Sequence, residues 1–370
     1  MIIILKPNLK SNSSEYQATL KALNSFPNIE ARVYLTQSGE NQITEVSLLG
    51  DTSQLLTQNI EALPAVLQVI RISNEYKLLG KHHNEHGFSF DYNGVEFSQD
   101  TFHIFAGLCA VDNQKNVSDT FKVLSENNQV CTRMGAYKPR TSPYSFQGLG
   151  QACLSYVFEA AGKYGVKVIA MEVTHERQVA EIHECLQQTG SPTGVMLQVG
   201  TRNAQNFELL RALGQQTTYP ILFKRGFGIT LHESILAAEY LAEAGNRNVV
   251  FCLRGVKSLF GAPHRNLADM AHVSVVKRLT KMPVCFDPSH SIGTLSVGDD
   301  QISDISHASA QAVISGANLL LTDIHPMPPE AVVDSKQAIS LQNLPWYLED
   351  MQYVRECYLH RAKLAKSYTK

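Results

Sequence analysis

The segment PILFKRGFGITLHESILAAEYLAEAGNRNVVFCLRG (residues 220–255) contains the pattern that decides the fold. Short apolar runs at its two ends, PILFKRG and NVVFCLRG, flank a stretch in which apolar residues recur at helical spacing. Strands that are apolar nearly throughout and bounded by Gly or Pro are typical of parallel strands buried on both faces. The segment therefore predicts a strand–helix–strand unit.

The same alternation extends in both directions, from residue 101 to residue 370. Eight such units in about 270 residues favour a (β/α)8 barrel over an open doubly wound sheet. No GxGxxG motif follows a strand, which argues against dinucleotide binding. The predicted strands lie within residues 102–110, 130–138, 167–173, 194–200, 220–226, 248–255, 283–290 and 318–326.

Residues 1–75 show a different order of elements. A strand, a helix, two strands joined by a polar turn, a second helix and a last strand follow one another, which is typical of a ferredoxin-like βαββαβ domain. Few residues with catalytic chemistry cluster there, so we predict a regulatory domain. We expect residues 76–100 to form a linker and a hairpin that turns at Asn93-Gly94, and residues 101–370 to form the catalytic barrel.

Composition excludes several classes of function. A formal charge of −2 gives no field suited to nucleic acid. No apolar run approaches the roughly 20 residues of a membrane span, and the start MIIILKP lacks the features of a signal peptide. The seven cysteines are widely spaced, which indicates reduced thiols and a cytoplasmic protein.

Cationic side chains gather where the predicted strands end, and barrel active sites lie at that end. Such a cluster would repel itself unless its substrates carried several negative charges, such as two phosphates and a carboxylate. The alternative for any one cation is a structural pair with a core carboxylate such as Glu172 or Asp287. The cations are Arg133, Lys138, Arg140, Arg202, Lys224, Arg225 and Arg254.

A second group combines a thiol, an imidazole and carboxylates. Cys109, His290, Asp323 and Asp334 come from the first, seventh and eighth strands and the loop after the eighth, which adjoin when a barrel closes. This combination suits a divalent transition metal that acts as a Lewis acid on a carbonyl. Taken singly, a cysteine such as Cys109 is more often a small buried residue than a ligand, and its place at the same barrel end as the other three favours the ligand.

Several motifs resemble the signature of 3-deoxy-D-arabino-heptulosonate 7-phosphate (DAHP) synthases. They are KPRTSPYSFQG (138–148), QVGTRNAQNFELL (198–210), FKRG (223–226), LRG (253–255) and DPSH (287–290). The likeness is greatest to the subfamily with an N-terminal ferredoxin-like domain, and it covers nearly the whole chain. The sibling family, 3-deoxy-octulosonate 8-phosphate synthase, shares the barrel but usually lacks that domain.

The resemblance implies that phosphoenolpyruvate condenses with erythrose 4-phosphate, the first step of the shikimate pathway to the aromatic amino acids. Lys138, Glu172 and His290 would then be catalytic, with Glu172 near the attacking water. Arg140 and Thr141 would hold the aldose phosphate, and Asp287 its hydroxyls. Phosphoenolpyruvate would be held by Arg133, Lys138, Arg202, Lys224 and Arg254, and a divalent ion (Mn, Zn, Co or Fe) by Cys109, His290, Asp323 and Asp334.

The resemblance also implies a homotetramer or dimer and feedback inhibition by tyrosine or phenylalanine through the N-terminal domain. The chain departs from the family at Asp323, where a metal-binding Glu is usual, and at Leu108 and Ala110 on either side of Cys109. Segments 258–266 and 291–304 also differ. Two alternatives follow: the same chemistry with another aldose phosphate, or a non-catalytic homologue that senses phosphoenolpyruvate or aromatic amino acids.

Overall fold

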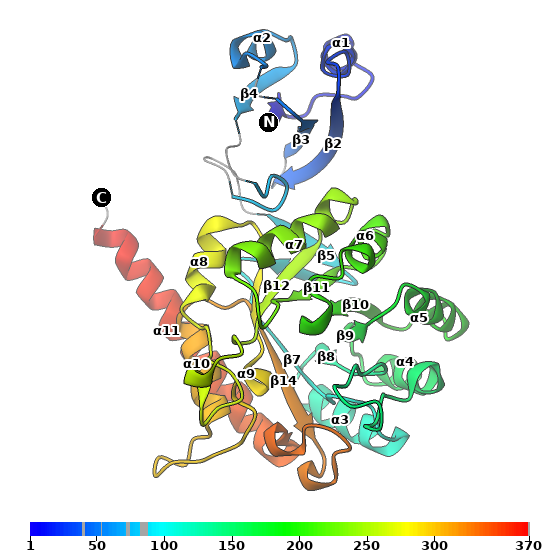
Figure 1. Ribbon diagram of the computed structural model, residues 1–370, viewed down its shortest axis with the longest axis vertical. Coiled ribbons are helices and arrows are strands. Elements are labelled where there is room, and N and C mark those ends of the chain that lie inside the picture. Colours follow the sequence, from blue (N-terminus) through cyan, green and yellow to red (C-terminus); the bar gives the residue numbers. More distant parts are fainter. Residues whose placement is uncertain (39–40, 53, 72–74, 82–87, 369–370) are drawn as a thin grey trace. The chain divides into compact units, whose positions relative to one another are not determined.

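Eight parallel strands form the centre of the unit Gly87–Lys370 (Figure 1). They are β7 (His103–Gly107), β8 (Cys131–Arg133), β9 (Val168–Val173), β10 (Gly194–Val199), β11 (Ile221–Lys224), β12 (Val249–Leu253), β13 (Val284–Phe286) and β14 (Leu319–His325). The structure is a computed structural model and describes residues 1–38, 41–52, 54–71, 75–81 and 88–368. Strands β8 to β14 pair in sequence order, β7 pairs with β14, and a bridge joins Leu108 to Met134. The sheet thus closes almost completely, which confirms the predicted (β/α)8 barrel.

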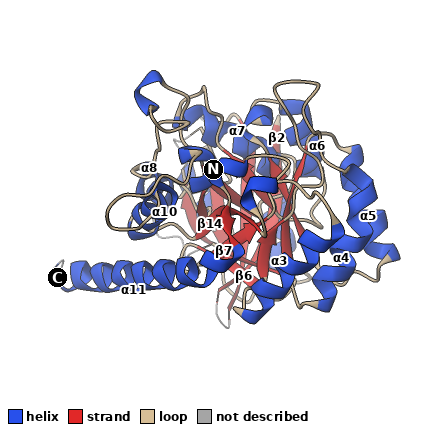
Figure 2. Ribbon diagram, turned by 90° about the horizontal axis from the view of Figure 1, so that it is seen from below, coloured by secondary structure: helices blue, strands red, loops and turns tan. Residues whose placement is uncertain are grey.

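Helices surround these strands (Figure 2). Helix α7 (Leu231–Glu243) illustrates how the sequence starts them: Thr230 and Glu233 form a capping box, in which each side chain binds the other's backbone N–H. Short strand β15 (Ile339–Ser340) pairs with β14. The helices are α3 (Gln114–Glu126), α4 (Leu154–Lys163), α5 (Arg177–Gln188), α6 (Phe207–Gln215), α7 (Leu231–Glu243), α8 (His272–Leu279), α9 (Pro288–Ile292), α10 (Asp304–Ile314) and α11 (Leu344–Tyr368).

A hairpin closes the barrel at the end where its strands begin. Its strands, β5 (Ser89–Tyr92) and β6 (Val95–Ser98), turn at Asn93 and Gly94 as predicted. Phe90 and Phe97 of this hairpin belong to the apolar cluster that fills the barrel interior. Within the described residues, the hairpin thus fills this end of the barrel, and the cavity lies at the opposite end, where the strands finish.

The unit Met1–His86 contains a four-stranded antiparallel sheet in the order β2-β3-β1-β4. Its elements are β1 (Ile2–Leu5), α1 (Ser14–Leu23), β2 (Ile29–Ser38), β3 (Asn41–Gly50), α2 (Thr57–Glu61) and β4 (Val66–Ile70). Ile3, Leu23, Val46 and Ile60 pack into its own core. This confirms the ferredoxin-like order. The predicted linker includes residues 82–87, which lie outside the described part of the chain.

Two further observations concern thiols and membranes. All seven cysteines are free, and burial raises the pKa of Cys131 in the barrel interior to about 12. A thiol with such a pKa behaves as a small apolar side chain.

Within the residues that the structure describes, no helix is both long and apolar enough to cross a lipid bilayer.

Candidate active site

A cavity of about 710 Å³ lies where the barrel strands end. Nine of the thirteen predicted site residues line it: Lys138, Arg140, Thr141, Glu172, Arg202, Lys224, Arg254, His290 and Asp334. The remaining four, Cys109, Arg133, Asp287 and Asp323, are buried and do not line the cavity. The barrel thus brings residues from eight separate strand ends to one place.

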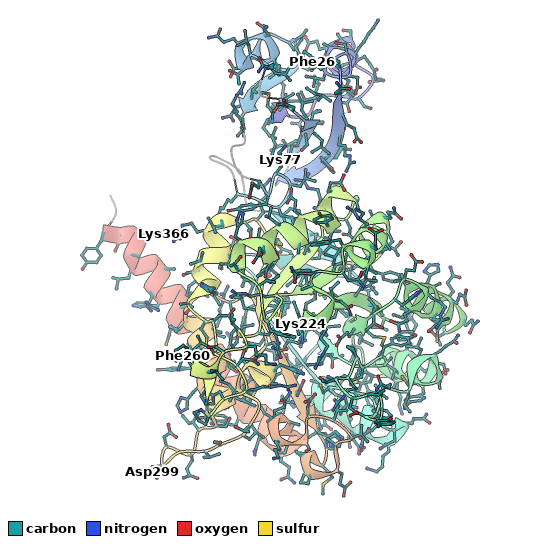
Figure 3. The ribbon with its side chains drawn as sticks, viewed as in Figure 1. Phe26, Lys77, Lys224, Phe260, Asp299 and Lys366 are labelled. Carbon is teal, nitrogen blue, oxygen red and sulfur yellow. The ribbon has the colours of Figure 1, made fainter. Side chains whose placement is uncertain are left out.

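Three of the buried cations each face a carboxylate. Arg133 donates to Asp323, and Lys224 Nζ lies 2.6 Å from Asp287 Oδ2. Lys224, labelled in Figure 3, ends strand β11 and still reaches the cavity. Lys138 Nζ lies 3.3 Å from an oxygen of Asp334 and 2.8 Å from the sulfur of Cys109. These pairs keep the site close to neutral around its centre.

Arg254, directly after β12, differs from these three. It is 5% exposed, donates to the carbonyl oxygen of His290 at 3.2 Å, and forms no ion pair with any described residue. Its Nε is buried without a hydrogen-bond partner. Burial lowers the pKa of this guanidinium below its usual value. A buried cation that lines a cavity and lacks a counter-charge calls for an anionic ligand.

Arg225, which we predicted among the cations of the site, has a structural partner instead. Its NH1 donates to Asp269 Oδ2 at 2.6 Å and to His272 Nδ1 at 2.9 Å, and it does not line the cavity. Its inclusion in the substrate-binding cluster was therefore wrong. The alternative of a structural pair with a buried carboxylate applies here.

The loop 134–153, after β8, carries the KPRT motif to the cavity. The amide of Lys138 donates to the carbonyl of Gln147 at 2.8 Å, which closes the loop on itself. Gly148 has a φ of +93°, and a Cβ there would lie 2.1 Å from the carbonyl oxygen of Ala136, so only glycine fits. Arg202 donates to Thr141 Oγ1 at 3.1 Å and links this loop to the turn after β10.

Glu172, in β9, presents its carboxylate to the cavity. One oxygen accepts from Gln198 Nε2 at 3.1 Å. The other lies where a Cβ on Gly200 would be, only 1.9 Å away, so a glycine at position 200 leaves room for this carboxylate. Glu172 is thereby placed among the cations without being paired to one of them.

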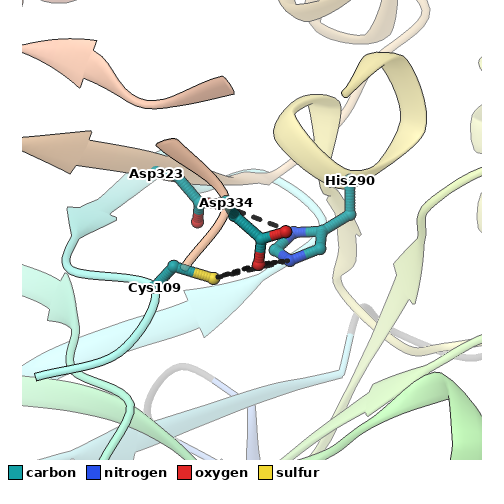
Figure 4. Close-up of side chains that lie close together, drawn as sticks. All are labelled: Cys109, His290, Asp323 and Asp334. Carbon is teal, nitrogen blue, oxygen red and sulfur yellow. Dashed lines mark hydrogen bonds and ion pairs between the residues drawn. The ribbon is translucent and has the colours of Figure 1, made fainter. Parts of the chain in front are cut away.

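Cys109, His290, Asp323 and Asp334 lie close together and could hold a metal ion (Figure 4). One donor atom from each lies within 4.8 Å of the others. Burial opposes the charge on His290, but Asp287, Asp323 and Cys109 outweigh it and raise its pKa to about 10. Burial also opposes the charge on Asp334, yet His290 and Lys138 hold its pKa well below the usual range. A soft thiolate, an imidazole and carboxylates are a donor set that fits a divalent transition metal.

Asp287 contacts this group of candidate metal ligands through His290. As the N-cap of α9, it accepts from the backbone N–H of His290 at 3.0 Å and lies 3.1 Å from His290 Nδ1. A carboxylate on one ring nitrogen orients the other nitrogen toward a ligand. These contacts account for Asp287 within the described structure, and its predicted role at the aldose hydroxyls stays a prediction.

The sequence did not identify four further polar residues of the site. Lys257, Arg265 and Asn266 line the cavity, and buried Gln337 accepts from Arg265 NH1 at 3.2 Å. Arg265 and Asn266 lie more than ten residues beyond the end of β12, where strand-end reasoning does not reach. Their signal was the unusual segment 258–266, in which they are the last two residues.

The fold and the site define a (β/α)8-barrel protein with a cavity lined by cationic side chains and a candidate metal centre. Residues 87–359 match the model of the DAHP synthetase I family. Over 352 residues, 95% of this chain and 97% of the relative, the chain is 33% identical to a phospho-2-dehydro-3-deoxyheptonate aldolase of Thermotoga maritima. The chain therefore belongs to the DAHP synthetase I family and is an enzyme of the DAHP synthase type, which forms a carbon–carbon bond.

Solved structures agree with this membership. The crystal structure of the Thermotoga maritima DAHP synthase matches with a TM-score of 0.69 at 31% identity and covers 96% of this chain and 97% of that one. A truncated form of the same enzyme matches with a TM-score of 0.65 at 29% identity and covers 77% and 98%. A 2-dehydro-3-deoxyphosphooctonate aldolase of Bordetella petrii is 26% identical over 68% of this chain and 89% of its own length. The similarity to the 2-dehydro-3-deoxyphosphooctonate aldolase is thus partial and more distant than the similarity to the DAHP synthase.

Proposed function

We propose that this chain condenses phosphoenolpyruvate with erythrose 4-phosphate and water to give DAHP and inorganic phosphate. The observation that carries this proposal is Arg254, a buried cation without a counter-charge among the described residues, at the wall of a cavity that three other arginines also line. Full-length similarity to a DAHP synthase supports the identity of the substrates.

The cations would bind phosphoenolpyruvate through its phosphate and carboxylate. Arg202, Lys224 and Arg254 line the cavity, and Arg133 is buried with its charge balanced by Asp323. Guanidinium groups bind such anions through two parallel hydrogen bonds, which orients the substrate as well as holding it. Bound in this way, carbon C3 of phosphoenolpyruvate would face the aldehyde.

The second substrate would lie toward the KPRT loop. Arg140 and Thr141 line the cavity together with Ser142 and Ser145, a set of donors suited to a phosphate. Carbon C3 of phosphoenolpyruvate attacks the aldehyde carbon, water adds at C2, and phosphate leaves as the C–O bond breaks. Glu172, close to the cations and unpaired with them, would hold the attacking water and accept its proton.

The group around Cys109 and His290 would hold a divalent ion. Such an ion would supply Lewis-acid polarisation of the aldehyde oxygen. Lys138, which contacts both Cys109 and Asp334, would link this group to the anion-binding side of the cavity. The identity of the metal, among Mn, Zn, Co and Fe, is part of this proposal.

Steady-state assays of the purified protein test the proposal. We expect DAHP formation from phosphoenolpyruvate and erythrose 4-phosphate, its loss on chelation, and its return with Mn²⁺, Zn²⁺ or Co²⁺. Five-carbon aldose phosphates serve as the comparison. Higher catalytic efficiency with one of them would assign another aldehyde, and absence of phosphoenolpyruvate consumption with every aldose would refute the condensation.

The N-terminal unit would bind tyrosine or phenylalanine as a feedback inhibitor. It contains a cavity of about 560 Å³ in which Tyr16, Val33 and Leu35 are suited to an aromatic ring, and Lys10 and Asn12 to a charged backbone. We expect deletion of residues 1–86 to leave activity and to abolish inhibition. A folded truncated protein without activity would contradict a purely regulatory role.

Two further parts of the proposal concern the cell and the assembly. Seven free thiols support a cytoplasmic protein.

A homotetramer or dimer is proposed on the family resemblance, and sedimentation velocity of the full-length protein tests it. A monomer at micromolar concentration would contradict it.

A further inference from the structure

The four candidate metal ligands do not have equal geometry. Cys109 Sγ lies 3.5 Å from His290 Nε2 and 3.2 Å from Asp334 Oδ2, and the last two atoms are 3.6 Å apart. Ligand atoms bound to a tetrahedral ion at about 2.0–2.3 Å are separated by roughly 3.3–3.7 Å. The three atoms therefore form one face of a metal coordination shell with little rearrangement.

Asp323 stands outside this face, and both of its oxygens are already engaged. Oδ1 accepts from Arg133 NH1, and Oδ2 accepts from Gln337 Nε2 at 2.6 Å. Oδ2 also lies 3.9 Å from Nδ1 of His290, the ring nitrogen that Asp287 contacts. Asp323 is thus farther away than the three closely spaced atoms are from one another, although one of its donor atoms lies within 4.8 Å of a donor atom of each of the other three residues.

The charge on Arg133 keeps Asp323 in this position. Arg133 is 3% exposed, and Asp323 is its ion-pair partner within the described part of the chain. A rotation of the Asp323 carboxylate that moved Oδ1 away from Arg133 would leave the buried guanidinium without that partner, which is costly at such depth. Gln337 opposes the same movement, because Arg265 holds its Oε1 and so directs its Nε2 at Asp323.

We propose that a divalent metal ion binds this chain through three side chains, Cys109, His290 and Asp334, while Asp323 does not touch the ion and instead positions Arg133. The inference rests on the metal site of the proposed function. Three protein ligands leave at least one further coordination position for water or substrate. With a thiolate among them, the site favours Zn²⁺, Co²⁺ or Fe²⁺ over Mg²⁺.

Two matched substitutions, Asp323→Asn and Asp334→Asn, test this assignment in the full-length protein. Each removes one charge and preserves side-chain shape. Metal-free preparations are titrated with CoCl₂, and calorimetry and the visible absorption of the cobalt–thiolate bond are recorded. We expect Asp323→Asn to weaken Co²⁺ binding by no more than about a hundredfold, as for a residue outside the coordination shell, with an unchanged spectrum, and Asp334→Asn to weaken it by clearly more than that. Equal losses in the two variants would overturn the proposal.

Asp323→Asn also removes the counter-charge of Arg133, so this variant can fail to fold. The crystal structure of the Co²⁺-loaded wild-type protein then decides: an Asp323 oxygen beyond about 3 Å from the ion supports the proposal, and one at a bonding distance of about 2.0–2.2 Å refutes it. DAHP synthesis is assayed on the same preparation. If the proposed role of Asp323 is incorrect, the protein still synthesises DAHP. If the proposed substrates are incorrect, DAHP synthesis is absent but the cobalt-binding result is unaffected.

Discussion

Arg225 and Arg254 occupy equivalent positions and have different partners. Each directly follows its strand, β11 or β12, and each is buried. Arg225 pairs with Asp269, whereas Arg254 lines the cavity and forms no ion pair with any residue that the structure describes. A charge at the end of a barrel strand therefore does not define a substrate contact. The partner of the charge determines its role. A cation that the protein neutralises stabilises the fold, whereas a buried cation that it does not neutralise needs a ligand.

The largest effect is expected from Arg254→Met. Loss of a charge-assisted contact to bound phosphoenolpyruvate should lower kcat/KM by about a thousandfold, equivalent to roughly 4 kcal/mol. Stability should stay the same or increase, because a buried unpaired charge is removed. Steady-state kinetics and thermal unfolding measure the two effects. A clear drop in the melting temperature would show that Arg254 has a structural role like that of Arg225.

Arg225→Met should show the opposite behaviour. It leaves Asp269 buried without its counter-charge, and breaking such a pair costs about 3–5 kcal/mol. We expect urea unfolding to report a loss of this size, while the KM for phosphoenolpyruvate changes by less than about twofold. A large rise in KM with unchanged stability would return Arg225 to the substrate site.

The double substitution Arg225→Met, Asp269→Asn should recover most of that loss. Asparagine removes the stranded charge and keeps an oxygen for the backbone N–H of Gly255, which donates to Asp269 Oδ1 at 2.8 Å. We expect a deficit of about 1 kcal/mol relative to wild type, measured by the same unfolding experiment. If the double variant is as unstable as the single one, an interaction other than the charge pair must stabilise this region.

The smallest expected effect is on the stability of the folded protein at low pH. Burial would raise the pKa of Asp269, but His272, Arg225 and the Gly255 amide favour its charged form and bring it below the usual 3.8. A depressed folded-state pKa contributes stability above the unfolded value and loses it as the pH falls through the folded value. The advantage of wild type over the double variant should therefore shrink below about pH 4. An advantage that is constant from pH 7 to pH 3 would contradict this.

The features that could be predicted from the sequence are those that depend on patterns among neighbouring residues. Alternating strands and helices indicated the barrel, and the rule that barrel sites lie at strand ends located Lys138, Glu172 and His290 at the cavity. The KPRT and DPSH motifs by themselves indicated the family. Such features need only neighbouring residues, so the chain itself contains the information.

Which charge neutralises which was decided by tertiary structure alone. Asp269 lies 44 residues after Arg225, and Gln337 lies 14 residues after Asp323, both in connecting segments whose return to the barrel no periodic pattern encodes. For the same reason, the sequence identified Asp323 as one of four acidic, thiol or imidazole ligands without showing that Arg133 and Gln337 hold its two oxygens. The sequence by itself determined the barrel and the residues at its open end. Only the packing of loops around that end decided which buried charges are satisfied by the protein and which need a ligand.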